Sequence, residues 1–118
     1  METTNIKSII WVGSSLKYLR TFPEEVKDYI GYALYEAQKG EMPTSAKPLK
    51  GLSGVIEIRA DFHKDTYRTV YAIKLGKKLY VLHAFKKKSK QGIATPKTDL
   101  NLIKARLNIA QELAKEEC

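Results

Sequence analysis

Three strand-like runs with very short connections constrain the fold of this chain most strongly. In residues 55–62 apolar and charged side chains alternate, as expected of a strand with two unlike faces. The apolar set is Ile56, Ile58, Ala60 and Phe62, and the charged set is Glu57, Arg59 and Asp61. Residues 67–75 and 78–85 are rich in β-branched and aromatic residues, and turns at 63–66 and 76–77 separate the three runs. Turns this short favour an antiparallel meander.

The N-terminal third of the chain predicts one strand and two helices. Residues 6–12 form a β-branched and aromatic run that Gly13 stops. Ser14 or Ser15 can cap a short helix, and Pro23 suits the first position of a second helix that ends at Gly40. Apolar residues at helical spacing mark the buried face of that second helix: Val26, Ile30, Ala33 or Leu34, and Ala37.

The remaining segments complete an α+β pattern. Residues 41–54 contain two prolines and two glycines and are expected to be a loop. Thr95-Pro96 is a typical helix start, followed by an apolar stripe of Leu100, Ile103, Leu107 and Ala110. The order β-α-α-β-β-β-α predicts one domain, residues 1–118, with the helices packed on one face of an antiparallel sheet. The other face would stay open and carry Arg59 and, depending on strand register, Arg68 or His83.

The composition excludes several classes of protein. No long uncharged apolar run indicates a membrane span, and the first residues lack the layout of a secretory signal. The only cysteine is Cys118, so no internal disulfide can form. We therefore expect a cytoplasmic protein with no membrane partner.

Positive charge is concentrated in the middle of the chain. Residues 41–97 hold 13 Lys and Arg against 4 Asp and Glu, a local charge of +9 within a chain of net charge +8. The densest part is Tyr80-Val-Leu-His-Ala-Phe-Lys-Lys-Lys-Ser-Lys90, in which an apolar run ends in four lysines. A fixed cluster of cations at one rim of a folded domain is suited to a polyanion such as RNA. The alternative is a solvated loop whose charge serves solubility.

Most enzymatic signatures are absent from the sequence. There is no glycine-rich phosphate loop, no zinc-type spacing of cysteine and histidine, no serine nucleophile elbow, and few acidic residues in the basic segment. No cofactor is therefore expected. The remaining cations, histidine and tyrosine suit metal-free RNA cleavage, in which the ribose 2′-hydroxyl attacks the adjacent phosphate. The same residues would also serve simple phosphate binding, and Arg59 and Arg68 can equally be cross-strand partners of Glu57 or Asp61.

Several motifs, in order along the chain, resemble the phage-derived branch of the RelE/HigB-type toxins. They are Val12-Gly-Ser-Ser-Leu16, Leu34-Tyr-Glu-Ala-Gln38, Ala46-Lys-Pro-Leu-Lys-Gly51, Val55-Ile-Glu-Ile-Arg59, Tyr67-Arg68, and the Tyr80 to Lys90 run followed by Thr95-Pro96. The resemblance implies the RelE-like fold and a toxin of a type II toxin–antitoxin system that cleaves mRNA on the ribosome without a metal. The implied partners are the ribosome, mRNA and a helix-turn-helix antitoxin.

The resemblance, together with the residues themselves, gives a set of candidate site residues. Arg59 and Arg68 match positions of phosphate-contacting arginines in RelE-type toxins, and Lys87 lies near another basic position. With His83 these make the catalytic candidates, and the RNA-binding candidates are Lys47, Lys50, Lys86, Lys88 and Lys90.

The sequence also departs from the RelE-type pattern in two places. Val55 and Glu57 stand where a lysine pair is common, and no tyrosine follows the last strand. Either His83 and the lysines transfer the protons, or catalysis is weak or different. The rival interpretation is a non-catalytic nucleic-acid-binding module that uses the same basic face. A third alternative is a phage-related structural protein.

Overall fold

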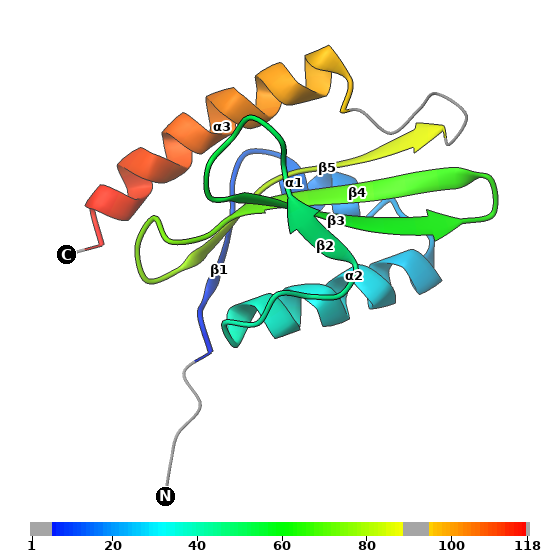
Figure 1. Ribbon diagram of the computed structural model, residues 1–118, viewed down its shortest axis with the longest axis horizontal. Helices are drawn as coiled ribbons and strands as arrows, with labels where there is room; N and C mark the ends of the chain where they lie inside the picture. The colour runs from blue at the N-terminus through cyan, green and yellow to red at the C-terminus, as the bar shows by residue number, and fades with distance from the viewer. Residues whose placement is uncertain (1–5, 89–94, 118) are drawn as a thin grey trace, which may run out of the picture.

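The computed structural model describes residues 6–88 and 95–117, without the side chain of Lys88 (Figure 1). Its elements in chain order are β1 (Ile9–Trp11), α1 (Ser15–Leu19), α2 (Glu24–Gln38), β2 (Ala46–Pro48), β3 (Val55–Phe62), β4 (Asp65–Ala72), β5 (Leu79–Lys88) and α3 (Lys97–Lys115). The α+β class and the predicted sequence of elements are confirmed, with one additional strand, β2. None of the helices in the described part of the chain combines the length and apolarity that a bilayer span needs.

The sheet has five strands in the order β1-β5-β4-β3-β2. β3, β4 and β5 form the antiparallel meander that the short turns predict, whereas β1 pairs with β5 in parallel. β2 lies inside the segment expected to be a loop and pairs antiparallel with β3 at the edge of the sheet. A three-residue strand that ends in Pro48 carries too little pattern to be recognised, and proline is tolerated there because the strand is at an edge.

The prediction that all helices lie on one face of the sheet is wrong. Figure 1 shows α2 and α3 on opposite sides of the sheet. α1 and α2 pack against one apolar cluster, which includes Ile58 and Tyr71, and α3 packs against a second one, which includes Val70 and Leu82. The central strand β4 is buried at every position after Asp65, so both of its faces need a cover. Two helical layers are therefore required.

The predicted helix faces are largely correct. Val26, Ile30, Ala33, Leu34 and Ala37 are all buried on α2. On α3 the buried positions are Ile103, Ala110 and Ala114, and Arg106 lies between them. The helices begin after Pro23 and Pro96, which occupy the N-cap positions.

Buried Arg106 joins α3 to the rest of the fold. Its Nη1 donates to the carbonyl of Leu82 at 2.9 Å, and its Nη2 donates to Ser14 Oγ at 2.9 Å. Gly13 has φ of +59°, and a Cβ at that position would lie 2.7 Å from Arg106 Nε. Glycine is therefore required here both for its backbone conformation and for the close approach of the guanidinium.

Candidate nucleic-acid interface

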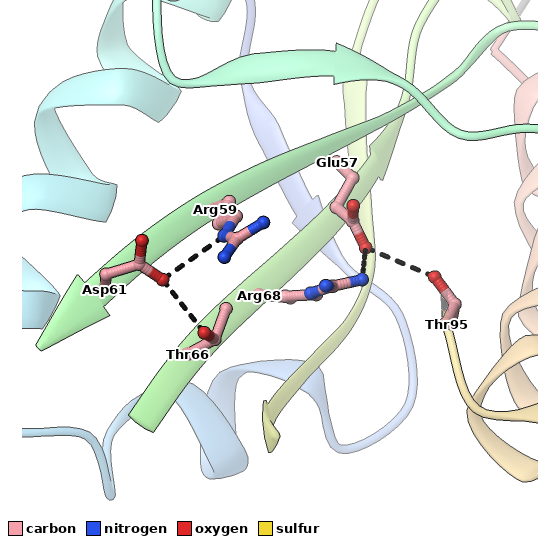
Figure 2. A network of polar contacts seen from close by, with 6 residues as sticks. All are labelled: Glu57, Arg59, Asp61, Thr66, Arg68 and Thr95. Atoms are coloured by element: carbon pink, nitrogen blue, oxygen red, sulfur yellow. Dashed lines mark hydrogen bonds and ion pairs between the residues drawn. The ribbon is translucent and has the colours of Figure 1, made fainter. Parts of the chain in front are cut away.

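The strand register brings three predicted cations to one face of the sheet. Arg59 on β3 lies directly opposite Arg68 on β4. Lys87 on β5 lies opposite Thr66 on β4. Thr66 is two residues from Arg68, so the side chains of Lys87 and Arg68 point to the same face of the sheet. Two arginines directly opposite each other repel, so each needs an anionic neighbour. Figure 2 shows these neighbours.

Arg68 is not on an open surface, contrary to the prediction. Its Nη1 donates to Glu57 Oε2 at 3.2 Å, and each side chain of the pair is only 3% exposed. Thr95 Oγ1 donates to the same oxygen at 3.3 Å (Figure 2). The Nε of Arg68 has no hydrogen-bond partner among the described residues. The preceding strand supplies a buried carboxylate at the diagonal position, so the arginine turns inward to it.

Arg59 is the most accessible arginine of the group. Its side chain is 35% exposed, and its Nε donates to Asp61 Oδ1 at 3.2 Å. Thr66 Oγ1 donates to the same oxygen at 2.9 Å. These donors outweigh partial burial and lower the pKa of Asp61, with the Thr66 hydrogen bond as the largest cause. The other nitrogens of Arg59 are available to an anion from solvent.

Lys87 is buried beside the arginines. It is 7% exposed, and burial lowers the pKa of its ammonium, with Arg68 and Arg59 adding to the shift and Glu57 opposing it. A lysine with a lowered pKa is deprotonated more often near neutral pH than a solvated one. It can then accept a proton as a general base.

Lys47 and Lys50 extend the cluster toward β2. Both are exposed, and with Glu57 and Thr95 they line a hollow of about 440 Å³. Lys47 lies directly opposite Glu57 in the β2–β3 register. The structure thus gathers these two lysines with Arg59, Arg68 and Lys87 around one buried carboxylate, from four different strands and a loop.

Glu57 and Thr95 are polar partners that the site prediction did not include. The period-two alternation of Glu57, Arg59 and Asp61 places all three on one face of β3. This alternation is the sequence signal that could have identified Glu57 as part of the site. Thr95 was expected to cap the last helix. Instead Pro96 takes the N-cap position, and the hydroxyl of Thr95 reaches Glu57.

His83 does not join this cluster. It lies four residues from Lys87 on the same strand, which separates their Cα atoms by roughly 13 Å, and Phe85 lies between them. Its Nε2 contacts Asp99 Oδ1 at 2.8 Å, and burial lowers the pKa of the imidazole despite the opposing effect of Asp99. His83 is therefore neutral at pH 7 and held by α3.

The lysine run at the end of β5 is divided between two faces. Lys86 points away from Lys87 and forms an ion pair with Asp65 at 3.7 Å, with its side chain 51% exposed. Lys90 and the side chain of Lys88 lie outside the described residues. No group of three or more His, Cys, Asp or Glu side chains that could hold a metal ion occurs within residues 6–88 and 95–117.

Comparisons with known proteins agree with this architecture. A family model described as phage derived protein Gp49-like (DUF891) matches residues 17–108. One chain in the crystal structure of the toxin–antitoxin complex RelBE2 from Mycobacterium tuberculosis superimposes with a TM-score of 0.50 and 17% identity, covering 70% of this chain and 99% of that one. No curated protein matches the sequence. The RelE-like fold and the phage-derived relationship expected from the motifs are confirmed.

Proposed function

Because this chain belongs to the phage-derived Gp49-like family, we propose that it is the toxin of a type II toxin–antitoxin system. It inhibits translation by cleaving mRNA on the ribosome, without a metal ion. The RelE-like fold supports this proposal, and so does the local +9 charge of residues 41–97. The observation that carries it is the gathering of Lys47, Lys50, Arg59, Arg68 and Lys87 on one face around Glu57.

Each cation has a distinct role in the proposed reaction. Arg59 is partly exposed and binds the scissile phosphate, where its guanidinium stabilises the added negative charge of the transition state. Lys87, as the neutral amine, takes the proton of the ribose 2′-hydroxyl. The 2′-oxygen bonds to phosphorus while the bond from phosphorus to the 5′-oxygen breaks. The exposed ammonium group of Lys47 or of Lys50 supplies one proton to that leaving oxygen.

Arg68 is a positioning residue in this scheme. Its guanidinium, paired with Glu57, adds to the effect of burial in lowering the pKa of Lys87, and Glu57 opposes this effect. His83, 4% exposed and hydrogen-bonded to Asp99, takes no part in proton transfer at this cluster.

An antitoxin and the ribosome are the proposed partners. The solved relative is a chain of a toxin–antitoxin complex, which supports an antitoxin partner for this chain. A small helix-turn-helix protein is the expected form of that antitoxin. Exposed Lys47 and Lys50 are suited to phosphate contacts with ribosomal or messenger RNA.

A translation extract programmed with one mRNA tests the proposed activity. The wild-type chain should cut the message in the presence of a chelator and leave 2′,3′-cyclic phosphate ends. Arg59→Ala should lose most of the cleavage, and Lys104→Ala, an exposed cation on α3, serves as the matched control. Intact mRNA in a translating extract that contains the wild-type chain contradicts the proposal.

A non-catalytic nucleic-acid-binding module is the second candidate. The nearly complete burial of Arg68 and its pairing with Glu57 favour it, because a buried, ion-paired guanidinium has less to offer a transition state. Arrested translation with an uncut message would support this candidate.

A further inference from the structure

A second hollow lies at the outer edge of β5. The register pairs β1 with β5 only from Leu79 to Val81, and no other strand in the described part of the chain lies on that edge. α1 and the residues after it flank the uncovered part on one side, and the first turn of α3 flanks it on the other. They enclose a pocket of about 520 Å³, within the range of small-molecule sites.

Aromatic side chains make up much of the lining. His83 stacks on Phe85, with ring centroids 4.9 Å apart and an interplanar angle of 18°. Tyr18 stands edge-on to His83 at 6.3 Å and is 46% exposed. Phe22 lines the same pocket and packs against Tyr67 at 4.8 Å. Such a set of rings suits a flat, partly apolar ligand.

The polar groups of the pocket suit a ligand with N–H donors and a phosphate. Asp99 accepts a hydrogen bond from neutral His83 through Oδ1, and its side chain remains 25% exposed. An ionised carboxylate has further acceptor positions, so Asp99 can also accept from a ligand N–H. His83 Nδ1 is buried without a partner among the described residues. Lys86, 51% exposed, also lines the pocket and provides a cation.

We propose that this pocket takes one unstacked nucleobase of the single RNA strand that crosses the cationic face, an inference that rests on the proposed function. Bases of single-stranded RNA are commonly stacked on aromatic rings and read through their hydrogen-bonding edges. Phe85 on β5 is the direct register partner of Arg68 on β4, so the pocket and the cationic cluster lie on adjacent strands. Asp99 reads the N–H groups of the base, and Lys86 contacts a neighbouring phosphate.

The pocket is tested by nucleotide titration of the isotopically labelled full chain, observed by NMR. The probes are the 5′-monophosphates of guanosine, adenosine, cytidine and uridine, with ribose 5-phosphate as the control that lacks a base. At least one nucleotide should shift the amide resonances of Phe85, Thr98 and Asp99 in a saturable manner. Equal shifts from ribose 5-phosphate would overturn the proposal, because they would indicate a phosphate site only.

A pair of tryptophan substitutions on α3 locates the binding. Thr98 is exposed and lines the pocket, whereas Asn101 is exposed and does not. Thr98→Trp should fill the hollow and weaken nucleotide binding at least about tenfold, comparable to the loss of one stacked base. Asn101→Trp should bind as the wild type does. Equal affinities of the two variants, or no binding of any nucleotide, contradict the pocket assignment.

The two proposals fail in different ways. Nucleotide binding is measured without ribosomes, so it does not depend on cleavage. A wild-type chain that binds nucleotides in this pocket but leaves mRNA intact contradicts the catalytic proposal and retains the base pocket. A chain that cleaves mRNA but shows no shifts of the pocket resonances contradicts the base pocket and supports the catalytic proposal.

Discussion

At the scale of single residues, the important feature is how the sheet distributes its charges. Arg59 and Arg68 are register partners, and each is compensated by a carboxylate from β3. Only Arg59 keeps substantial exposure. The two arginines, equivalent in the sequence motifs, are therefore physically different: one can meet a substrate, and the other holds a buried ion pair.

Removing Arg68 should destabilise the protein strongly. Arg68→Ala leaves the carboxylate of Glu57 buried without its partner, which typically costs about 3–5 kcal/mol. The double variant Arg68→Met with Glu57→Leu should recover most of the free energy of unfolding, because an apolar pair of similar volume replaces the ion pair. Urea denaturation measures both changes.

Cleavage by the double variant then separates structure from chemistry. Normal cleavage would make Arg68 a purely structural residue, whereas lost cleavage at restored stability would assign it to the substrate site. A single Arg68→Ala variant as stable as the wild type would contradict the buried ion pair itself.

The pH dependence of cleavage should depend on Lys87. Burial lowers the pKa of its ammonium, so the neutral amine becomes available below the ordinary value of 10.5. The single-turnover rate should rise with pH until that lowered pKa is passed. Lys87→Arg keeps the charge but cannot be deprotonated, so it should remove this rise and most of the activity. An unchanged pH profile in Lys87→Arg excludes Lys87 as the base.

The same lowered pKa affects stability. Between the folded-state pKa of Lys87 and 10.5, the unfolded chain binds more protons than the folded one. The free energy of unfolding contributed by this lysine therefore rises with pH across that window, and Lys87→Met should flatten the rise.

At the scale of elements, α3 determines what the sheet can expose. It covers the face that also carries the charged residues of β3, and buried Arg106 anchors it to β5 and to the start of α1. Its first turn contributes Thr98 and Asp99 to the pocket at the β5 edge, and the residue before its N-cap contributes Thr95 to Glu57. Docking of this one helix thus shapes both candidate sites.

Gly13 should be sensitive to substitution because of this docking. Gly13→Ala forces a side chain into the left-handed region, which costs about 1–2 kcal/mol, and brings its Cβ against Arg106. The melting temperature should fall. Gly31→Ala, in an open position inside α2, is the matched control and should leave stability unchanged or slightly higher. Equal effects of the two substitutions would contradict the role of the Gly13–Arg106 contact.

At the scale of the whole molecule, the basic excess is concentrated in the middle of the chain. The strands and loops between residues 41 and 97 hold the local +9, while the two flanks together hold −1 from 8 Lys and Arg against 9 Asp and Glu. Folding brings Lys47, Lys50 and Arg59 near one another from separate segments. This local excess of positive charge attracts a polyanion over long distances.

RNA binding should accordingly weaken as salt rises. The logarithm of the affinity should fall linearly with the logarithm of salt concentration, by about 0.7 per phosphate contact on a single strand. Lys50→Ala should lower this slope by about one contact, and Lys104→Ala on α3 should not change it. Fluorescence anisotropy with a labelled RNA strand measures the slope. A slope that is insensitive to salt in the wild type removes the electrostatic basis of the interface.

The sequence by itself determined every element except β2, and it determined the buried face of α2. Alternation in β3 and helical spacing in α2 are local patterns, and short turns leave antiparallel pairing as the simplest connection. The family resemblance correctly implied the RelE-like fold, and the residues that bear positive charge were identifiable one by one.

Only the tertiary structure decided which of these residues meet. Whether Arg68 lies on a surface depends on the β3–β4 register and on the diagonal contact with Glu57, and whether His83 is free depends on where α3 docks. The placement of α3 on the second face likewise follows from β4 being buried on both sides. These are long-range relations between segments far apart in the chain, and no local periodicity encodes them, because their free energy arises only when the layers pack together.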